Sequence, residues 1–256
     1  MRIFISGGAP LGRALAEWYA DVGIRIHEGY GLTETSPVVA VNTERNHRIG
    51  SVGKPLANVE VRVAQDGEIL VRGPSVFQGY WNKPDETRAA FVDGWFQTGD
   101  IGRLDEDGFL YVTDRKKDLL KTSGGKFIAP QPIENTLKHY SLIAEAVVVG
   151  DRRKFPAALI FPNFAALENR AREHNLVFSS RAELVTLAEV RRQYAEILSE
   201  VNESLAQFEK LKAFRLIPEE LSAANGTLTA SLKLRRGTIE EHFRLQIEEM
   251  YSESRP

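Results

Sequence analysis

The residues of this sequence that could do chemistry begin with a short loop, Glu28-Gly29-Tyr30-Gly31-Leu32-Thr33-Glu34-Thr35. Its glycines let the backbone approach a ligand closely, because they carry no Cβ and accept positive φ. The Tyr30 ring can lie against a purine, and the Thr33 hydroxyl can bind a phosphate oxygen. Glu34 can hold Mg²⁺, which prefers a few carboxylates together with phosphate oxygens. A surface turn with incidental polar residues would have the same composition, so the loop alone decides nothing.

Three further segments carry groups that suit a nucleotide. In Thr98-Gly99-Asp100, a carboxylate behind a glycine can accept hydrogen bonds from the hydroxyls of a ribose. The stretch 227–236 presents Lys233 among hydroxyl and apolar residues, and a lysine on a loop can neutralise charge that develops on a phosphate. The turn Gly7-Gly8-Ala9-Pro10 lacks the Lys and Ser/Thr of a P-loop, so we expect it to border a purine or an apolar substrate. Taken singly, each segment has an equally good structural explanation. This explanation is a plain turn for residues 7–10 and 98–100, and a basic start of a helix for residues 227–236.

The elements that must position these groups fall into two patterns. A buried strand over residues 2–5, a helix through Leu11, Leu15, Trp18 and Tyr19, and a strand over residues 24–27 predict a βαβ unit with parallel strands. Residues 50–111 instead contain short alternating segments with turns at Asp66-Gly67 and at residues 105–108. This second pattern predicts a small β-rich layer or barrel.

The charged run Asp114-Arg115-Lys116-Lys117-Asp118 predicts the domain boundary, with one domain over residues 1–114 and a second over residues 115–256. The second domain is predicted to be α+β. Its strands are expected over residues 119–121, 144–149, 157–161 and 213–217, and its helices over residues 132–139, 163–173, 182–208 and 236–250. Ser180-Arg181-Ala182-Glu183 has the pattern of a capping box for the long helix.

Composition limits the function. A net charge of -2 in 256 residues gives no sign of a general nucleic-acid binder. The absence of cysteine excludes disulfides, thiolate metal sites and a cysteine nucleophile, and it fits a cytoplasmic location. No apolar run reaches the roughly 18 residues that span a bilayer. No basic amphipathic helix stands out as an anchor, and peripheral contact with a membrane is left open.

Together the segments resemble the adenylate-forming superfamily, which comprises acyl-CoA synthetases, luciferases and the adenylation domains of peptide synthetases. Tyr30-Gly31-Leu32-Thr33-Glu34 resembles the Tyr-Gly-x-Thr-Glu motif of that family. Residues 67–73 with Gly79-Tyr80 resemble the next motif, Thr98-Gly99-Asp100 the one after, and residues 114–126 the hinge motif. The resemblance spans nearly the whole chain, and motifs in this order are far more specific than any one of them.

The resemblance implies a fold that combines α/β and α+β parts. The first domain would be the C-terminal portion of the large AMP-binding domain, with a βαβ piece and a small barrel-like β layer, and the second would be the mobile C-terminal domain. Lys233, Thr33 and Glu34 are implied to be catalytic, with Thr33 at the α-phosphate and Glu34 as the Mg²⁺ ligand. Lys117 falls at the interdomain hinge, and Gly124 and Gly125 in the loop on the CoA side.

The same resemblance implies the nucleotide contacts. Asp100 and Arg115 would hold the ribose, and the adenine and acyl pocket would be lined by Gly8, Ala9, Pro10, Glu28, Gly29, Tyr30 and Gly31. Family members join a carboxylate to AMP with release of pyrophosphate, and then rotate the smaller domain for thioester formation. ATP, AMP and Mg²⁺ are therefore the implied ligands, and coenzyme A the co-substrate.

The stretch 229–236 resembles long-chain fatty acyl-CoA synthetases, since Leu232 stands where many other branches carry glycine. The sequence departs from the family in one respect: it holds no Ser/Thr/Gly-rich loop followed by Pro-Lys-Gly, which grips the β- and γ-phosphates. We therefore expect this chain to be the C-terminal half of a fatty acyl-CoA ligase that is inactive alone. The missing N-terminal half would be supplied in cis or in trans. A non-catalytic module that binds AMP or acyl-adenylate, a subunit completed in trans and an amino-acid adenylation domain stay open as alternatives.

Overall fold

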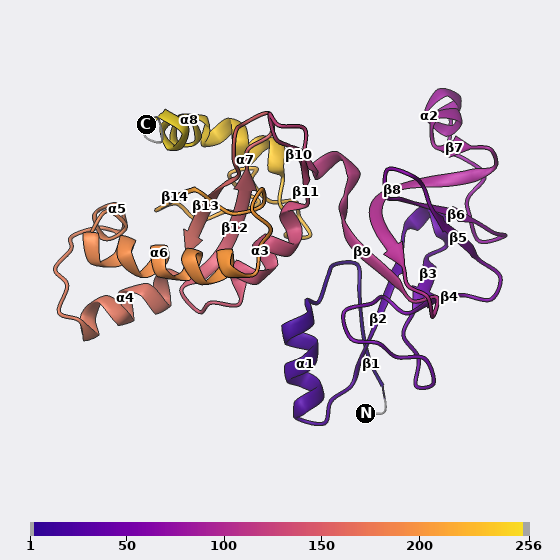
Figure 1. Cartoon of the computed structure of the whole chain (residues 1–256), viewed down its shortest axis with the longest axis horizontal. Helices are drawn as coiled ribbons and strands as arrows, with labels where there is room; N and C mark the ends of the chain where they lie inside the picture. Colours follow the sequence, from indigo (N-terminus) through magenta and orange to yellow (C-terminus); the bar gives the residue numbers. More distant parts are fainter. Residues whose placement is uncertain (1–2, 253–256) are drawn as a thin grey trace. The chain divides into compact units, whose positions relative to one another are not determined.

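Figure 1 shows the computed structural model of the chain, which describes residues 3–252. The chain forms two compact units, Met1–Lys117 and Asp118–Pro256, which we call unit 1 and unit 2. The short 3₁₀ helix η2 (Lys116–Asp118) spans the boundary between them in the sequence. Of the predicted first strand, Arg2 lies outside the described residues.

The first sheet of unit 1 has the strand order β1-β2-β3-β4. β1 (Phe4–Gly7) runs parallel to β2 (Ile26–Gly31), and α1 (Arg13–Asp21) lies between them in the sequence, which confirms the predicted βαβ piece. β3 (Val38–Val41) and β4 (Lys54–Pro55) extend the sheet in antiparallel fashion, and the 3₁₀ helix η1 (Thr33–Thr35) connects β2 to β3.

The prediction that β1 is a buried strand is wrong. The side chain of Ile5 is 73% exposed and that of Phe4 is 37% exposed. β1 is the edge strand of its sheet, with β2 as its only paired neighbour among residues 3–252. An apolar sequence can predict that a strand forms, but the neighbouring elements decide whether it is buried.

The motif segment that begins at Glu28 is also only partly a loop. Its first half continues β2 to Gly31, because Gly29 and Tyr30 pair with Val41 and Ala40 of β3. At Gly31 the chain passes so close to its neighbour that an added Cβ would lie 1.7 Å from the carbonyl oxygen of Pro37. A side chain at this position would therefore displace the backbone that carries the motif.

The second sheet of unit 1 is antiparallel and has the order β5-β6-β8-β7, with β9 paired to β8. Its strands are β5 (Glu60–Val63), β6 (Glu68–Arg72), β7 (Phe91–Val92), β8 (Trp95–Leu104) and β9 (Leu110–Arg115), and α2 (Pro84–Ala89) precedes β7. Val39 and Ala40 of β3 pack against Ile69, Val71 and Leu110 to form the core between the two sheets. The predicted β-rich layer is confirmed, and within the described part of the chain its pairing does not close into a barrel.

Unit 2 is built on a three-stranded sheet in which β12 (Ile143–Val149) is antiparallel to β13 (Ala157–Pro162), and β13 is parallel to β14 (Ala213–Leu216). One core joins one face of the sheet to α3 (Pro130–Lys138), α4 (Phe164–Glu173) and α6 (Ala188–Glu203). A second core joins the opposite face to α7 (Arg236–His242) and α8 (Arg244–Ser252) (Figure 1). Val147 and Val148 lie in different cores, as the alternation of side chains along a strand requires. A short hairpin, β10 (Leu120–Lys121) with β11 (Phe127–Ile128), precedes α3.

Two predicted helices of unit 2 are broken. The helix expected over residues 182–208 is divided into α5 (Arg181–Leu184) and α6, and α6 ends at Glu203. The Thr186 hydroxyl donates to the Glu183 carbonyl oxygen at 2.7 Å, which is the local competition that ends helices at such residues. The helix expected over residues 236–250 is broken at Phe243, whose φ of -100° and ψ of 23° leave the helical region. Ser180 does cap α5, since its hydroxyl accepts from the Glu183 amide at 3.2 Å.

A largely buried ion pair ties α7 to the rest of unit 2. Arg236 donates to both carboxylate oxygens of Glu134, one of them at 2.8 Å, and the Val148 amide donates to the same carboxylate at 2.7 Å. The Glu134 side chain is 3% exposed and that of Arg236 is 16% exposed. Removing one partner of such a pair leaves a buried charge without compensation, which is strongly destabilising.

We therefore expect Glu134→Ala to lower the free energy of unfolding of unit 2 by about 3 kcal/mol or more. Glu220→Ala, which removes an exposed partner of Arg181, is the control and should cost about 1 kcal/mol at most. Urea unfolding followed by circular dichroism measures the change. All three tryptophans lie in unit 1, so the tryptophan fluorescence transition should stay where it is. Equal effects of the two variants would contradict the structural role given to Glu134.

Candidate active site

The centre of the candidate site in unit 1 is the carboxylate of Asp100, on β8. The Tyr30 hydroxyl, on β2, donates to Asp100 Oδ2 at 2.5 Å, and Arg115 Nε, at the end of β9, lies 2.9 Å from Asp100 Oδ1. Arg115 also donates to the Thr98 carbonyl oxygen at 3.3 Å. Three of the motifs singled out in the sequence thus meet at one carboxylate, and their strands belong to both sheets of unit 1.

Burial decides the electrostatics of this centre. Asp100 is 4% exposed, and burial raises the pKa of its carboxyl above the usual value, while the Tyr30 hydroxyl and the Arg115 guanidinium act in the opposite direction. Burial, followed by the negative charge of Asp100, raises the pKa of the Tyr30 hydroxyl far above its usual range. Tyr30 therefore stays a neutral donor, and the Asp100 carboxylate is an acceptor that is already oriented.

The turn after β1 lies beside β2 because the two strands are parallel. Gly7 pairs with Gly29, and the Leu11 amide is 3.4 Å from Glu28 Oε1. Burial raises the pKa of the Glu28 carboxyl, and the Leu11 amide partly opposes the rise. Gly8, Ala9 and Pro10 are exposed on this edge of the sheet. The structure therefore places the predicted purine-bordering turn next to the first residue of the motif.

The hydroxyl and carboxylate of the motif differ in their surroundings. Thr33 is exposed, whereas Glu34 is half-buried and accepts from the Tyr80 hydroxyl at 3.1 Å. Thr35 is fully buried, and its side chain bridges the Leu32 amide, at 2.9 Å, to the Pro37 carbonyl oxygen, at 2.8 Å. Thr35 thus fixes the turn that presents Thr33 and Glu34.

A single carboxylate suits a magnesium ion that a nucleotide brings with it. Mg²⁺ is commonly held by one or two carboxylates, with phosphate oxygens and waters as the other ligands. Within residues 3–252 no group of three or more His, Cys, Asp or Glu side chains is placed to hold a metal by itself. Glu34 therefore fits the predicted metal-ligand role only together with a bound phosphate.

The end of unit 1 carries an anchor that the sequence reasoning missed. Lys116 Nζ lies 2.7 Å from Glu68 Oε2 and 2.8 Å from Asp66 Oδ2, and the Gly99 amide donates to Glu68 Oε1 at 3.0 Å. Glu68 is 5% exposed. Because Arg115 and Lys116 are both bound to side chains of unit 1, Lys117 is the first residue of the charged run outside this anchor. The signal in the sequence was a single glutamate, Glu68, that begins a strand whose next three residues are apolar, and residues 68–71 are all buried.

Lys233 lies in unit 2, in a tight hairpin before α7. Leu228 and Leu234 form a β-bridge, the Thr229 amide donates to the Lys233 carbonyl oxygen at 2.8 Å, and the Lys233 amide donates to Thr229 Oγ1 at 3.0 Å. Leu232 has a φ of 60°, in the left-handed region, and its side chain is 73% exposed. The hairpin holds the lysine at its tip, and the ion pair of Arg236 holds the base of the hairpin.

The loop with Gly124 and Gly125 connects β10 to β11. Gly125 has a φ of 79°, the Gly125 amide donates to the Thr122 carbonyl oxygen at 2.8 Å, and the Lys126 amide donates to Thr122 Oγ1 at 3.1 Å. Both glycines are exposed. The loop is thus a tight turn whose tip is open to a ligand.

Two models of known protein families match this chain. A family model described as AMP-binding enzyme matches residues 1–81, and one described as AMP-binding enzyme C-terminal domain matches residues 117–255, more than half of the chain. The chain belongs to the AMP-binding enzyme family.

Relatives of this AMP-binding enzyme are named as fatty-acid ligases. The long-chain-fatty-acid–CoA ligase FadD15 of Mycobacterium bovis is 41% identical over 98% of this chain and 42% of its own length. The human long-chain-fatty-acid–CoA ligase 6 is 33% identical over 98% of this chain and 38% of its own length. The chain therefore spans less than half the length of these relatives.

Solved structures similar to this AMP-binding enzyme confirm the adenylate-forming fold. O-succinylbenzoate coenzyme A synthetase of Bacillus subtilis, in complex with AMP, has a TM-score of 0.68 at 30% identity and covers 93% of this chain and 45% of its own. The structure of the same enzyme in complex with ATP and magnesium has a TM-score of 0.69 at 30% identity, and it covers 92% of this chain and 46% of its own. The adenylation domain of a carboxylate reductase from Mycobacterium chelonae has a TM-score of 0.78 over 97% of this chain and 38% of its own, and its 22% identity supports the fold alone.

We expect Tyr30→Phe to lower the free energy of unfolding of unit 1 by about 1.5–3 kcal/mol, the usual contribution of a hydrogen bond to a charged group. Tryptophan fluorescence in urea measures the loss, and Tyr80→Phe, which removes a partly exposed bond to Glu34, should cost less than about 1 kcal/mol. The difference in the free energy of unfolding between wild type and Tyr30→Phe should shrink as the pH falls through the raised pKa of Asp100. The reason is that the Tyr30 hydroxyl stabilises a charged carboxylate more than a protonated carboxyl. A difference that stays constant with pH would exclude Asp100 as the charged partner.

We expect Leu232→Gly to raise the free energy of unfolding of unit 2 by up to about 1 kcal/mol, because glycine adopts the left-handed conformation without the strain of a Cβ. Little burial is lost, since Leu232 is largely exposed. Ala230→Gly, at an exposed position where φ is not positive, is the control and should destabilise slightly. Thermal unfolding followed by circular dichroism distinguishes the two, and a loss of stability in both would show that Leu232 is not strained.

Proposed function

We propose that this chain is the C-terminal part of an AMP-forming acyl-CoA ligase that activates a long-chain fatty acid. The observation that carries the proposal is the meeting of Tyr30, Asp100 and Arg115, which come from three separated family motifs, at one buried carboxylate. In this proposal residues 1–114 are the end of the large AMP-binding domain, and residues 115–256 are its mobile C-terminal domain. The overall reaction joins the fatty carboxylate to AMP with release of pyrophosphate, and then transfers the acyl group to the thiol of coenzyme A.

In the first step the residues of unit 1 hold the nucleotide. The Asp100 carboxylate accepts hydrogen bonds from the ribose hydroxyls, and Arg115 keeps that carboxylate charged and oriented. The adenine lies along the edge formed by Gly8, Ala9, Pro10, Glu28, Gly29, Tyr30 and Gly31. The exposed Thr33 hydroxyl binds the α-phosphate. Glu34 holds a magnesium ion, which when bound neutralises phosphate charge.

The residues of unit 2 serve both steps. In the first, Lys233 neutralises the charge that develops at the α-phosphate as the fatty carboxylate oxygen bonds to phosphorus and the bond to pyrophosphate breaks. In the second, the Gly124-Gly125 turn borders the path of the coenzyme A thiol, whose sulfur bonds to the acyl carbon while AMP leaves. Between the two steps, a rotation of unit 2 about Lys117 replaces the Lys233 hairpin by the Gly124-Gly125 turn. Because Lys116 is bound to side chains of unit 1, Lys117 is the first residue that can turn with unit 2.

The relatives and one residue of this chain support the proposed substrate class. Two proteins named as long-chain-fatty-acid–CoA ligases share 41% and 33% identity with the chain, which favours a long-chain fatty acid. Leu232, in place of a glycine, favours the same branch. The second candidate is an amino-acid adenylation domain, which would use the same nucleotide residues and feed a carrier protein.

The 256 residues contain no loop that grips the β- and γ-phosphates, so we propose that they bind AMP but do not turn over alone. A polypeptide that supplies this loop, in cis or in trans, would complete the enzyme. A module that binds AMP or acyl-adenylate without catalysis would share the binding and would never turn over.

The test measures AMP binding and carboxylate-dependent exchange between ATP and pyrophosphate. We expect the chain to bind AMP by calorimetry, and Asp100→Asn to weaken binding about tenfold or more, which corresponds to about 1.4 kcal/mol. Lys233→Ala should leave AMP binding unchanged, because it acts on the reacting phosphate. AMP binding that does not respond to Asp100→Asn would refute the placement of the ribose.

The exchange assay uses palmitate, octanoate, acetate, benzoate and a mixture of amino acids, with the chain alone and with the polypeptide that precedes it in a longer relative. Exchange with palmitate only in the completed enzyme, and its loss in Lys233→Ala, is the expected result. Exchange with an amino acid would favour the second candidate. Robust exchange by the chain alone would show that the phosphate loop is dispensable.

A further inference from the structure

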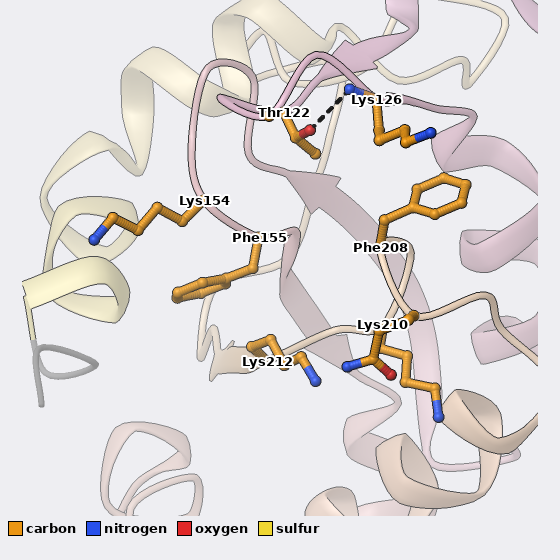
Figure 2. Close-up of a pocket in the computed structure, with 9 residues that line it drawn as sticks. Thr122, Lys126, Lys154, Phe155, Phe208, Lys210 and Lys212 are labelled. Atoms are coloured by element: carbon orange, nitrogen blue, oxygen red, sulfur yellow. Dashed lines mark hydrogen bonds between the residues drawn. The ribbon is translucent and has the colours of Figure 1, made fainter.

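Phosphate groups need cations, and the two units would supply them differently in the proposed reaction. Unit 2 has a pocket of about 620 Å³ that Gly124 of the proposed coenzyme A turn borders. Four lysines also line this pocket, namely Lys126, Lys154, Lys210 and Lys212 (Figure 2). In unit 1 the cation would instead be a magnesium ion, held by the Glu34 carboxylate. The nucleotide site therefore depends on how one glutamate side chain is oriented.

The carboxylate of Glu34 is bound through one of its two oxygens. The Tyr80 hydroxyl donates to Glu34 Oε1 at 3.1 Å, and the two residues are 46 positions apart in the sequence. Within residues 3–252, no donor is bound to Glu34 Oε2. Both side chains are partly open to solvent, with Tyr80 37% exposed. A carboxylate that is held by one oxygen can present the other to a metal ion.

The backbone of Glu34 is fixed by the same segment that carries Tyr80. The Phe77 amide donates to the Glu34 carbonyl oxygen at 2.8 Å, so this segment binds both the main chain and the side chain of Glu34. A glutamate side chain has several rotamers, and fixing one of them when a ligand binds costs conformational entropy. A donor that holds the carboxylate before the metal arrives reduces this cost.

Aromatic packing holds the Tyr80 ring independently of Glu34. The Tyr80 ring lies edge-on to the Phe77 ring, with the ring centres 4.8 Å apart. Phe77 in turn stacks on Phe91 at 5.7 Å and meets Phe96 edge-on at 5.3 Å. Phe96 is 3% exposed and belongs to β8, so this cluster is anchored in the second sheet of unit 1.

The backbone at Tyr80 is held by α2. The Tyr80 amide donates to Thr87 Oγ1 at 2.9 Å, and the Thr87 hydroxyl donates to the Lys83 carbonyl oxygen at 2.8 Å. At Gly79 an added Cβ would lie 2.5 Å from Thr87 Cγ2, so the chain passes too close to the helix for a side chain. Tyr80 is therefore a fixed donor, and Glu34 is the group that it orients.

We propose that Tyr80 is the positioning residue of the magnesium site: its hydroxyl holds Glu34 Oε1, so that Oε2 is left to face the metal ion. This role of Tyr80 rests on the function proposed above, which assigns Glu34 to magnesium. Carboxylates that bind a metal are hydrogen-bonded in their turn, and loss of such a partner commonly weakens metal binding about tenfold to a hundredfold. Tyr80 acts through Glu34 and does not itself bind the metal.

Calorimetry of ATP binding to the whole chain, with magnesium chloride and with EDTA, tests this role. The ratio of the two affinities measures the gain that magnesium provides. We expect magnesium to tighten ATP binding to wild type, and Tyr80→Phe to reduce that gain about tenfold. The affinities for ATP in EDTA and for AMP should stay unchanged, because Tyr80 acts only through the metal ligand.

Two further variants serve as references. Tyr111→Phe is the matched control, because it removes another tyrosine hydroxyl of unit 1 from a carboxylate, Asp105 Oδ2 at 3.2 Å, and it should keep the wild-type gain. Glu34→Gln should lose the gain, since its amide oxygen brings no negative charge to the metal. Circular dichroism verifies that each variant is folded.

An equal loss of ATP affinity with and without magnesium in Tyr80→Phe would show a merely structural role and would overturn the proposal. A gain that Glu34→Gln removes and Tyr80→Phe leaves intact would also overturn it, as would the absence of any gain in wild type. AMP binding in metal-free buffer is the separate test of the nucleotide site. A chain that binds AMP and fails the magnesium test therefore contradicts the role of Tyr80 alone.

Exchange between ATP and pyrophosphate in the completed enzyme gives a second readout. Tyr80→Phe should raise the magnesium concentration for half-maximal exchange about tenfold, with a rate at saturating magnesium close to that of wild type. An unchanged magnesium requirement would overturn the role of Tyr80, even where the chain alone binds ATP too weakly to measure.

Discussion

The buried carboxylate of Asp100 is the constraint on which the arrangement of unit 1 depends. A carboxylate that is 4% exposed must have donors, and it finds them in Tyr30 of one sheet and Arg115 at the end of the other. Meeting this need fixes β2, β8 and β9 relative to one another. It also orients the carboxylate that we propose as the acceptor for the ribose, so the same bonds that stabilise the fold would prepare that site.

Glu134 is the corresponding buried carboxylate of unit 2, and it too is paired with donors from separate elements. Its carboxylate accepts from the Val148 amide of β12 and from Arg236 at the start of α7, so a helix, the sheet and the base of the Lys233 hairpin share one anchor. The tip of the hairpin is held differently, through the Thr229 side chain and a strained Leu232. A rigid base and a locally strained tip are compatible with the role proposed for Lys233, which is to reach a bound nucleotide in one step and withdraw in the next.

Local patterns in the sequence predicted the elements whose partners are local or whose pattern is continuous. The β5–β6 hairpin follows from Asp66-Gly67, and β12 and β13 follow from their apolar runs. The exposure of Ile5 could not be predicted, because it depends on which elements cover β1 rather than on β1 itself. The break at Thr186 depends on one side-chain hydrogen bond that competes with the helix. Tyr30 and Asp100 were each assigned to a nucleotide, but a bond between residues so distant in sequence leaves no periodic trace.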